Sequence, residues 1–168
     1  NGVGPSGAQA LATFKSLRTL QSFKLNMWGN DIQPSGAKAL ASLHELQELS
    51  TLGLNFGCNL LGETGVEALI PLKNTPLLKN LSLNLWYCGI GDGGVKVLKE
   101  FEQASKLTTL NLILWGNDLS NVSIPVLLNL NMMPSVQTMF LDLRCNKLSM
   151  QFKECFQDAP GCLLNVAI

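Results

Sequence analysis

The sequence predicts an α/β solenoid: a curved, open stack of about five repeats, with a parallel sheet on the concave face and helices on the convex face. Apolar residues recur every 29 residues, and no insertion interrupts this register over five periods. Each period contains one stretch with the two-residue alternation of a strand and one with the spacing of a helix. Since strands stack at about 4.8 Å and helices no closer than roughly 8 Å, such a stack has to curve toward its strands.

The strand is the first element of the repeating unit. Phe23, Leu25 and Met27 alternate with Lys24 and Asn26, which is typical of a strand with one buried face. A lone strand and helix cannot bury their inward faces, so neighbouring units must stack and merge their apolar columns into one core. The central column contains Leu25, Leu54, Leu83, Leu112 and Leu141.

A sharp turn follows each strand, and a polar column marks it. We expect these side chains to be buried and to satisfy backbone groups that the turn would otherwise leave unpaired. Cys88, a weaker donor than asparagine, occupies one of the positions. The column contains Asn30, Asn59, Cys88, Asn117 and Asn146.

A helix of about three turns completes each unit. Ala8, Leu11 and Phe14 recur at three-residue steps, and the preceding segments PSG, PSG and ETG place Ser or Thr beside the helix start, where such side chains cap helices. The expected repeat boundaries are 4–32, 33–61, 62–90, 91–119 and 120–148, with 149–168 as a terminal partial repeat or cap.

The two ends of the chain fit the same register. The final segment LLNVAI alternates as a sixth strand would, with Ile168 in the register of Phe23, and Asn1 falls in the register of Asn30. We expect one domain over 1–168 that is a fragment of, or an uncapped piece within, a larger protein, because repeat stacks need polar caps at their ends.

These columns form a known motif, L-x-L-x-x-N/C-x-L, which the first period fills with Leu25, Met27, Asn30 and Ile32. The chain therefore resembles a leucine-rich repeat protein over essentially its whole length. The long period, with its helical half G-A/V-x-A-L, is similar to the ribonuclease-inhibitor-like class. One departure is the motif's first leucine, which is replaced by Ser22, Thr51, Asn80, Thr109 and Thr138.

Composition excludes several classes of partner. Twelve basic and twelve acidic residues cancel, so the chain lacks the basic excess of a nucleic-acid binder. No apolar run approaches the roughly 18 residues of a membrane span, so we expect no direct membrane insertion. Charged residues are 14% of the chain, well below the roughly 25% of soluble domains, which favours burial against partners.

The cysteines indicate structural thiols. Five cysteines include no C-x-x-C pair and accompany a single histidine, His44, so we expect no metal site. Cys155 and Cys162 are the one pair close enough to bridge locally. Free thiols favour a reducing compartment, hence an intracellular location, cytoplasmic or organellar. The glycine-rich GIGDGG at 89–94 lacks the G-K-[ST] ending of a phosphate loop, and we expect no cofactor.

The candidate site is the concave face, because the strand residues that alternate with the core must point there. All three tryptophans fall in one of its columns, which Gly57 interrupts and could leave with a dent. This row is either a set of lids over the strand-end turns or a binding strip, since Trp and Arg are preferred anchors of protein interfaces. The predicted partner-binding residues are Lys24, Asn26, Trp28, Asn55, Asn84, Trp86, Asn111, Ile113, Trp115, Phe140, Asp142 and Arg144.

The resemblance implies a non-catalytic protein–protein interaction module, acting as a scaffold or an accessory subunit of a multi-subunit assembly. Two alternatives remain open at this point. Some relatives of this repeat class activate GTPases with a loop arginine, and Arg18 and Arg144 are the arginines available here. The other alternative is a ligand-sensing ectodomain.

Overall fold

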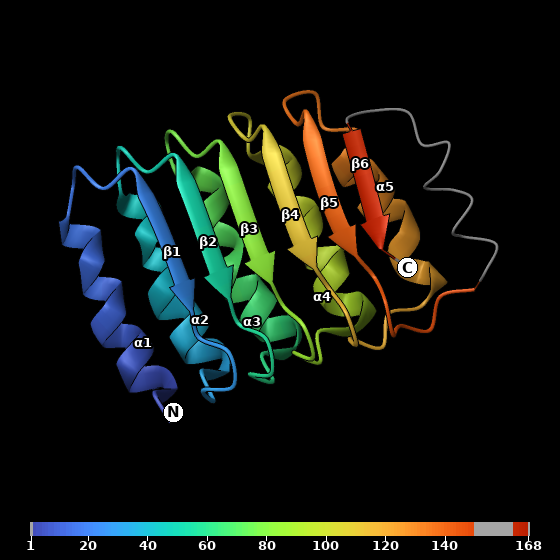
Figure 1. Cartoon of the computed structure of the whole chain (residues 1–168), viewed down its shortest axis with the longest axis horizontal. Coiled ribbons are helices and arrows are strands. Elements are labelled where there is room, and N and C mark those ends of the chain that lie inside the picture. Colours follow the sequence, from blue (N-terminus) through green and yellow to red (C-terminus); the bar gives the residue numbers. More distant parts are fainter. Residues whose placement is uncertain (1, 150–162, 168) are drawn as a thin grey trace.

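Each period of the chain folds as a strand, a turn and a helix, and the units stack side by side into an open solenoid (Figure 1). The structure is a computed structural model, and it describes residues 2–149 and 163–167. The strands are β1 (Ser22–Asn26), β2 (Thr51–Asn55), β3 (Asn80–Asn84), β4 (Thr109–Ile113), β5 (Thr138–Asp142) and β6 (Leu163–Ala167).

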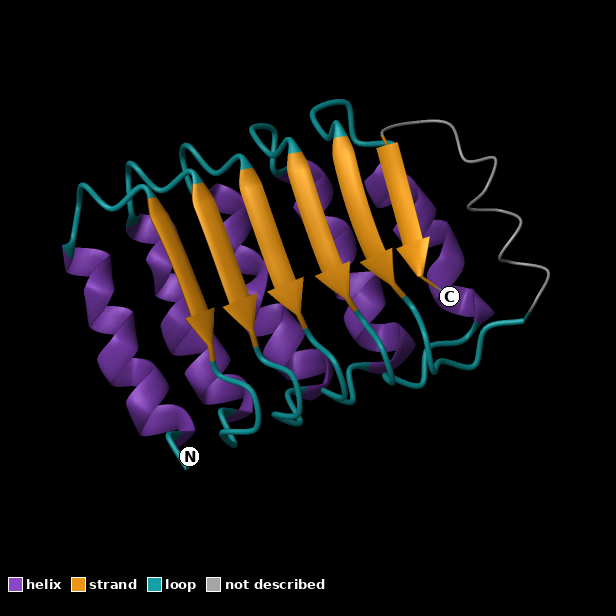
Figure 2. Ribbon diagram, viewed as in Figure 1, coloured by secondary structure: helices purple, strands orange, loops and turns teal. Residues whose placement is uncertain are grey.

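The α-helices all lie on one side of the sheet (Figure 2), and a short 3-10 segment adjoins each of them. The opposite side of the sheet is left open and is called the concave face below. The helices are α1 (Gly4–Ala12), α2 (Gln33–Ala41), α3 (Gly62–Leu69), α4 (Gly91–Leu98) and α5 (Ile124–Asn131), with 3-10 segments η1 (Thr13–Ser16), η2 (Ser42–Glu45), η3 (Ile70–Asn74), η4 (Lys99–Gln103) and η5 (Asn121–Ser123). None of the helices described is long and apolar enough to span a membrane.

The sheet is parallel, with its strands in sequence order from β1 to β6. From β1 to β5 the partners are 29 residues apart, as in Leu25 opposite Leu54. The expected sixth strand is present, but its predicted register is wrong: Met139 pairs with Leu164, 25 residues later. Pairing follows the backbone hydrogen bonds, so a connection four residues shorter moves the last strand, and Leu164 takes the position in register with Phe23. Most of the terminal partial repeat or cap expected at 149–168 lies outside the described residues.

The core lies between the sheet and the helices, as the apolar columns predict. Leu54, Leu83 and Leu112 point inward and are buried, and Leu40 and Leu69 meet them from the helical layer. The burial pattern of the three central strands alternates residue by residue. One side of each strand therefore faces the core and the other faces the concave surface.

The start of each helix differs from the prediction. No side chain caps α1 to α4, and the expected Ser and Thr residues lie within the first turn. Each of these helices begins at a residue with positive φ, a glycine in three of them and Gln33 in the other. The next repeat satisfies the exposed amides instead, since the N–H of Gly4 donates to the carbonyl of Asn30 and that of Gly62 to Cys88, both at 2.9 Å. At α1 and α3 the first N–H of the helix is thus satisfied by the next repeat and not by a side chain of its own.

The asparagine column confirms its predicted role at the turns. The Asn59 side chain accepts the N–H groups of Asn30 and Ile32 at 3.0 Å and donates to the carbonyls of Met27 and Phe56 at 2.8 and 2.7 Å. Asn117 and Asn146 repeat this arrangement in later turns. Each amide therefore ties its own turn to the turn before it and fixes where the strand ends project their side chains.

Candidate functional site

The candidate site lies on the concave face, where an aromatic row at the carboxyl ends of the strands adjoins a polar hollow over their middle. The aromatic row follows from the repeat. Trp28, Trp86 and Trp115 each stand two residues beyond the end of a strand, so the register of the sheet aligns them.

The three indoles form a stack, called the aromatic ladder below. The rings of Trp86 and Trp115 are 4.8 Å apart between centroids with an interplanar angle of 9°, and those of Trp28 and Trp86 are 6.4 Å apart at 16°. Trp28 is 52% exposed, whereas the other two are partly covered. The inner faces of the rings contact one another, so the ladder presents ring edges and the outer face of Trp28 to solvent.

Gly57 explains how the ladder closes, and the expected dent above it is absent. Trp28 and Trp86 lie two strands apart, which alone would separate them by about 9.6 Å. Because Gly57 has no side chain, both rings lean over it: a Cβ there would lie 2.9 Å from Cδ1 of Trp28 and 3.4 Å from Cε3 of Trp86. The glycine is what makes the stack continuous.

An arginine closes the other end of the ladder. The guanidinium of Arg144 lies 5.3 Å from the ring centroid of Trp115, a cation–π contact. It also forms two hydrogen bonds to Asp142, Nε to Oδ1 at 2.9 Å and Nη2 to Oδ2 at 2.6 Å. Asp142 is predicted on the exposed face, but it is only 3% exposed, since it lies between strands β4 and β6 and is paired with Arg144. Hydrogen bonding from Arg144 holds the pKa of the Asp142 carboxyl below its usual value, despite its burial.

Tyr87 belongs to the aromatic ladder, although the strand pattern did not predict it. Its ring packs edge-on against Trp86 at 5.7 Å and tilted against Trp115 at 6.1 Å. It lies over Gly116, where a Cβ would be 2.8 Å from the tyrosine ring. The backbone of Tyr87 has a φ of 48°, which turns the side chain out of the strand alternation. The signal in the sequence was the adjacent pair Trp86–Tyr87.

Two buried donors in the ladder have no acceptor. The indole Nε1 atoms of Trp86 and Trp115 are covered, and neither has a hydrogen-bond partner in the described part of the chain. A buried N–H without a partner costs free energy, on the order of 1–3 kcal/mol. Stacking and apolar contact therefore hold these rings in place.

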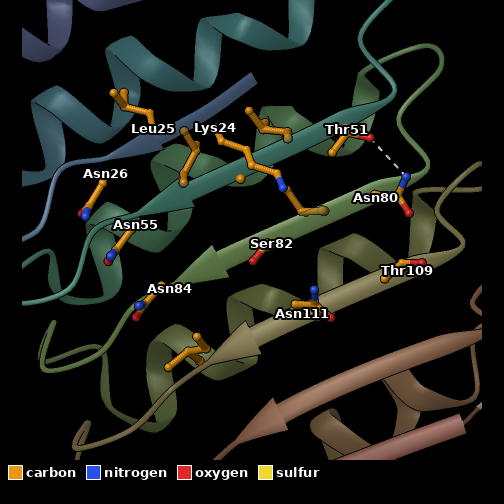
Figure 3. Close-up of a pocket in the computed structure, with 15 residues that line it drawn as sticks. Lys24, Leu25, Asn26, Thr51, Asn55, Asn80, Ser82, Asn84, Thr109 and Asn111 are labelled. Carbon is orange, nitrogen blue, oxygen red and sulfur yellow. Dashed lines mark hydrogen bonds between the residues drawn. The ribbon is translucent and has the colours of Figure 1, made fainter. Parts of the chain in front are cut away.

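A hollow of about 610 Å³ lies next to the ladder, over the middle of strands β1 to β4 (Figure 3). Three carboxamides on successive strands line it: Asn26, Asn55 and Asn84. In each case the side-chain Oδ1 accepts the backbone N–H two residues later, at 3.0 to 3.1 Å. These three residues are called the amide row below.

The other predicted residues of the face lie around this hollow. Lys24 extends across Gly53, whose Cβ would be 3.3 Å from the lysine Cγ, and its exposed side chain lines the hollow (Figure 3). Asn111 and Ile113 line it from β4 and are partly exposed. Phe140, on β5, is partly exposed on the same face but does not line the hollow. Eleven of the twelve predicted residues therefore keep at least part of their surface on the concave face, and Asp142 does not.

Candidate catalytic groups are engaged elsewhere or stand apart from this face. His44 Nδ1 contacts the carbonyl of Ala41 at 2.9 Å on the helical side. Asp92 holds Ser120 and Ser123 at the start of η5: its Oδ1 accepts the Ser120 N–H at 2.9 Å, and both hydroxyls donate to its carboxylate. Within 2–149 and 163–167, no group of three or more His, Cys, Asp or Glu residues could hold a metal ion.

Comparisons with known proteins show a similarity over part of the chain. A family model described as "Leucine Rich repeat" matches residues 16–41 and 81–99. No curated protein matches the chain. Among solved structures, an internalin (inlF) from Listeria monocytogenes is similar over 94% of this chain, with 17% sequence identity and a TM-score of 0.43. The matched region is 50% of the internalin chain, so this chain spans about half of that structure's length.

Proposed function

We infer that this chain, a leucine-rich repeat protein, binds another protein through its concave face, with the aromatic ladder as the anchor. The observation that carries this proposal is the pre-stacked row from Trp28 to Arg144, which is held in place before any partner arrives. Trp and Arg dominate the binding energy of protein interfaces. A row that is already ordered loses little conformational entropy on binding.

A non-catalytic role fits the chemistry of the face. Among the described residues in the strand columns of this face, the one carboxylate, Asp142, is paired with Arg144 at 2.6 Å, and no histidine lies there. The same ion pair argues against the GTPase-activator alternative. Arg144 is paired with Asp142 and packed on Trp115, so it is not free to reach a phosphate. Arg18 is exposed, and no feature of its surroundings favours that activity.

The proposal extends to the setting of the module. A rigid solenoid with few charges suits a scaffold or an accessory subunit of a larger assembly better than a freely diffusing enzyme. The 29-residue period with an α-helix in each unit supports assignment to the ribonuclease-inhibitor-like class. Cys58, Cys88 and Cys145 are free thiols, which supports an intracellular location.

The test compares Trp28→Ala with the native protein. Trp28 is the exposed end of the ladder and packs against one ring only, so its removal should leave the fold intact. The partner is first identified by capture on the immobilised native protein followed by mass spectrometry, and its affinity is then measured by calorimetry. We expect Trp28→Ala to weaken association at least about fivefold, more than about 1 kcal/mol.

Val122→Ala is the matched control, because Val122 is an exposed apolar residue in η5, outside the ladder and the amide row. It should bind as the native protein does. Equal affinity of the native protein and Trp28→Ala, with the same urea midpoint, would show that the ladder is not the contact.

A further inference from the structure

The hollow beside the aromatic ladder is rich in hydrogen-bond donors and has no acidic group. No carboxylate lines it, whereas Lys24 and several carboxamides and hydroxyls do. Among the residues that the structure describes, Lys24 forms no ion pair. The charge of the hollow is therefore positive and uncompensated.

The amide row adds to the excess of hydrogen-bond donors over acceptors in the hollow. In Asn26, Asn55 and Asn84 the Oδ1 atom is occupied by a backbone N–H. This fixes the orientation of the amide, since the flipped rotamer would bring an NH₂ group against an N–H. Each Nδ2 group is left without an acceptor in the described part of the chain. Three amides that would ordinarily offer both donors and acceptors thus present free donors.

The spacing of these donors suits a carboxylate. The three residues are register partners on adjacent strands, so their NH₂ groups repeat at about 4.8 Å. Two donors at that separation can each reach one oxygen of a carboxylate, with N–H···O distances near 2.9 Å. Hydrogen bonds to an ionised acceptor are also the stronger kind.

We propose that the hollow binds carboxylates of an extended acidic segment in the protein partner. The NH₂ groups of the amide row donate hydrogen bonds to the carboxylate oxygens, and Lys24 supplies the opposite charge. This assignment rests on the proposed function, and it places the acidic side chains beside the apolar contact that the ladder makes.

Other anionic or polar ligands fit the face less well. Sugars bind by laying a ring on an aromatic face, but none of the described residues that line the hollow is aromatic. In the ladder, stacking and Arg144 leave the outer face of Trp28 open, and Trp28 does not line the hollow. A nucleic acid needs many cations to displace its counterions, and the hollow has one, Lys24. An acidic peptide needs only a few charges neutralised and can use neutral donors for the rest.

The decisive variant is Asn55→Asp, which replaces the free NH₂ with a carboxylate oxygen of the same shape. Its fold is expected to persist, because Asp142 occupies the same column and its Oδ1 also accepts the N–H two residues later, at 3.2 Å. Asn129→Asp makes the same charge change at an exposed position of α5 on the helical side and serves as the matched control.

Fluorescence polarisation with three dye-labelled probes tests the proposal on the full chain: the peptide (Glu-Gly)₄, the peptide (Gln-Gly)₄ and an eight-residue oligothymidylate. We expect the glutamate peptide to bind at least tenfold more tightly than the glutamine peptide. Asn55→Asp should weaken binding of the glutamate peptide at least tenfold, and Lys24→Gln should weaken it at least threefold. Asn129→Asp should change it by less than twofold.

Each other outcome overturns the proposal. Equal binding of the two peptides would show that the hollow does not select carboxylates. Equal weakening by Asn55→Asp and Asn129→Asp would show that only overall charge matters, and tighter binding of the oligothymidylate would make the hollow a nucleic-acid site. If Trp28→Ala weakens binding of the captured partner and Asn55→Asp leaves that binding unchanged, the protein-binding function stands and the proposal of an acidic segment is wrong. If neither variant affects the partner, both fail.

Discussion

At the scale of single residues, one glycine determines the form of the candidate site. Gly57 stands in a column of large side chains, and its missing Cβ lets Trp28 and Trp86 meet at 6.4 Å. Its φ is not in the left-handed region, so the backbone would accept other residues there. The need for glycine comes from the two rings and not from the chain.

Gly57→Ala therefore tests the ladder without straining the backbone. A Cβ would lie 2.9 Å from Cδ1 of Trp28, so the two rings must separate, and overpacking of this kind costs about 1–3 kcal/mol. We expect the near-ultraviolet dichroism of the stacked indoles to fall and the urea midpoint to decrease. Gly53→Ala, in the strand that precedes Gly57 and also without positive φ, would place its Cβ nearest to Lys24 and should leave the indole signal unchanged. An unaltered spectrum in Gly57→Ala would contradict the stack.

At the scale of the element, the turns after strands β1 to β4 are each held by a side chain from the next repeat. Cys88 is the exception in this column. It donates to the Phe56 carbonyl at 3.1 Å, the bond that an amide makes in neighbouring turns, but it has fewer hydrogens to donate. Burial raises the pKa of the Cys88 thiol from 9.0 to about 11, outweighing the backbone hydrogen bonds that would lower it.

This raised pKa predicts a loss of stability in alkali. Below pH 9.0 the thiol is neutral in both the folded and the unfolded chain, and the full stability is present. Between pH 9.0 and about 11 the unfolded chain releases the proton while the folded chain retains it, so the free energy of unfolding falls, by up to roughly 3 kcal/mol. Urea midpoints at pH 8 and pH 10.5 measure the effect.

Cys88→Ser provides the comparison, because a serine hydroxyl can hydrogen-bond in the same place and does not titrate in this range. All other side chains are the same in the two proteins. We expect the native protein to lose more stability than Cys88→Ser between the two pH values. Parallel losses would mean that the Cys88 thiol is accessible to solvent in the folded state.

At the scale of the whole molecule, one hydrophobic core joins neighbouring repeats over the described part of the chain. The core is continuous from Ala8 to Leu143, and the described cysteines are free. In a stack of this kind the free energy of folding is approximately the sum of repeat and interface terms.

The proposed intracellular location predicts indifference to reducing agents. We expect the thermal midpoint in 5 mM dithiothreitol to lie within about 1 °C of the midpoint without it, since a structural disulfide usually contributes about 2–4 kcal/mol and its loss would move the midpoint by several degrees. Cys155→Ser, which removes one member of the pair that could bridge locally, should likewise leave the midpoint unchanged. A large decrease in either experiment would favour an ectodomain.

The sequence by itself determined the repeat, the alternation of the strands and the residues that face outward. The 29-residue step from Leu25 to Leu141 fixes the stacking, and the two-residue period fixes the face, because both follow from the covalent geometry of a short segment. The buried role of Asn59 and Asn117 was predictable for the same reason: a turn leaves backbone groups that only a side chain can satisfy.

The tertiary structure decided how those outward residues meet. The lean of Trp28 and Trp86 over Gly57 and the contacts of Tyr87 and Arg144 with Trp115 join residues of different repeats. Such contacts depend on rotamers and on distances across the sheet, which the pattern along one strand does not contain. The 25-residue step to β6 has the same origin, because strand pairing is set by backbone hydrogen bonds in space and not by counting along the chain.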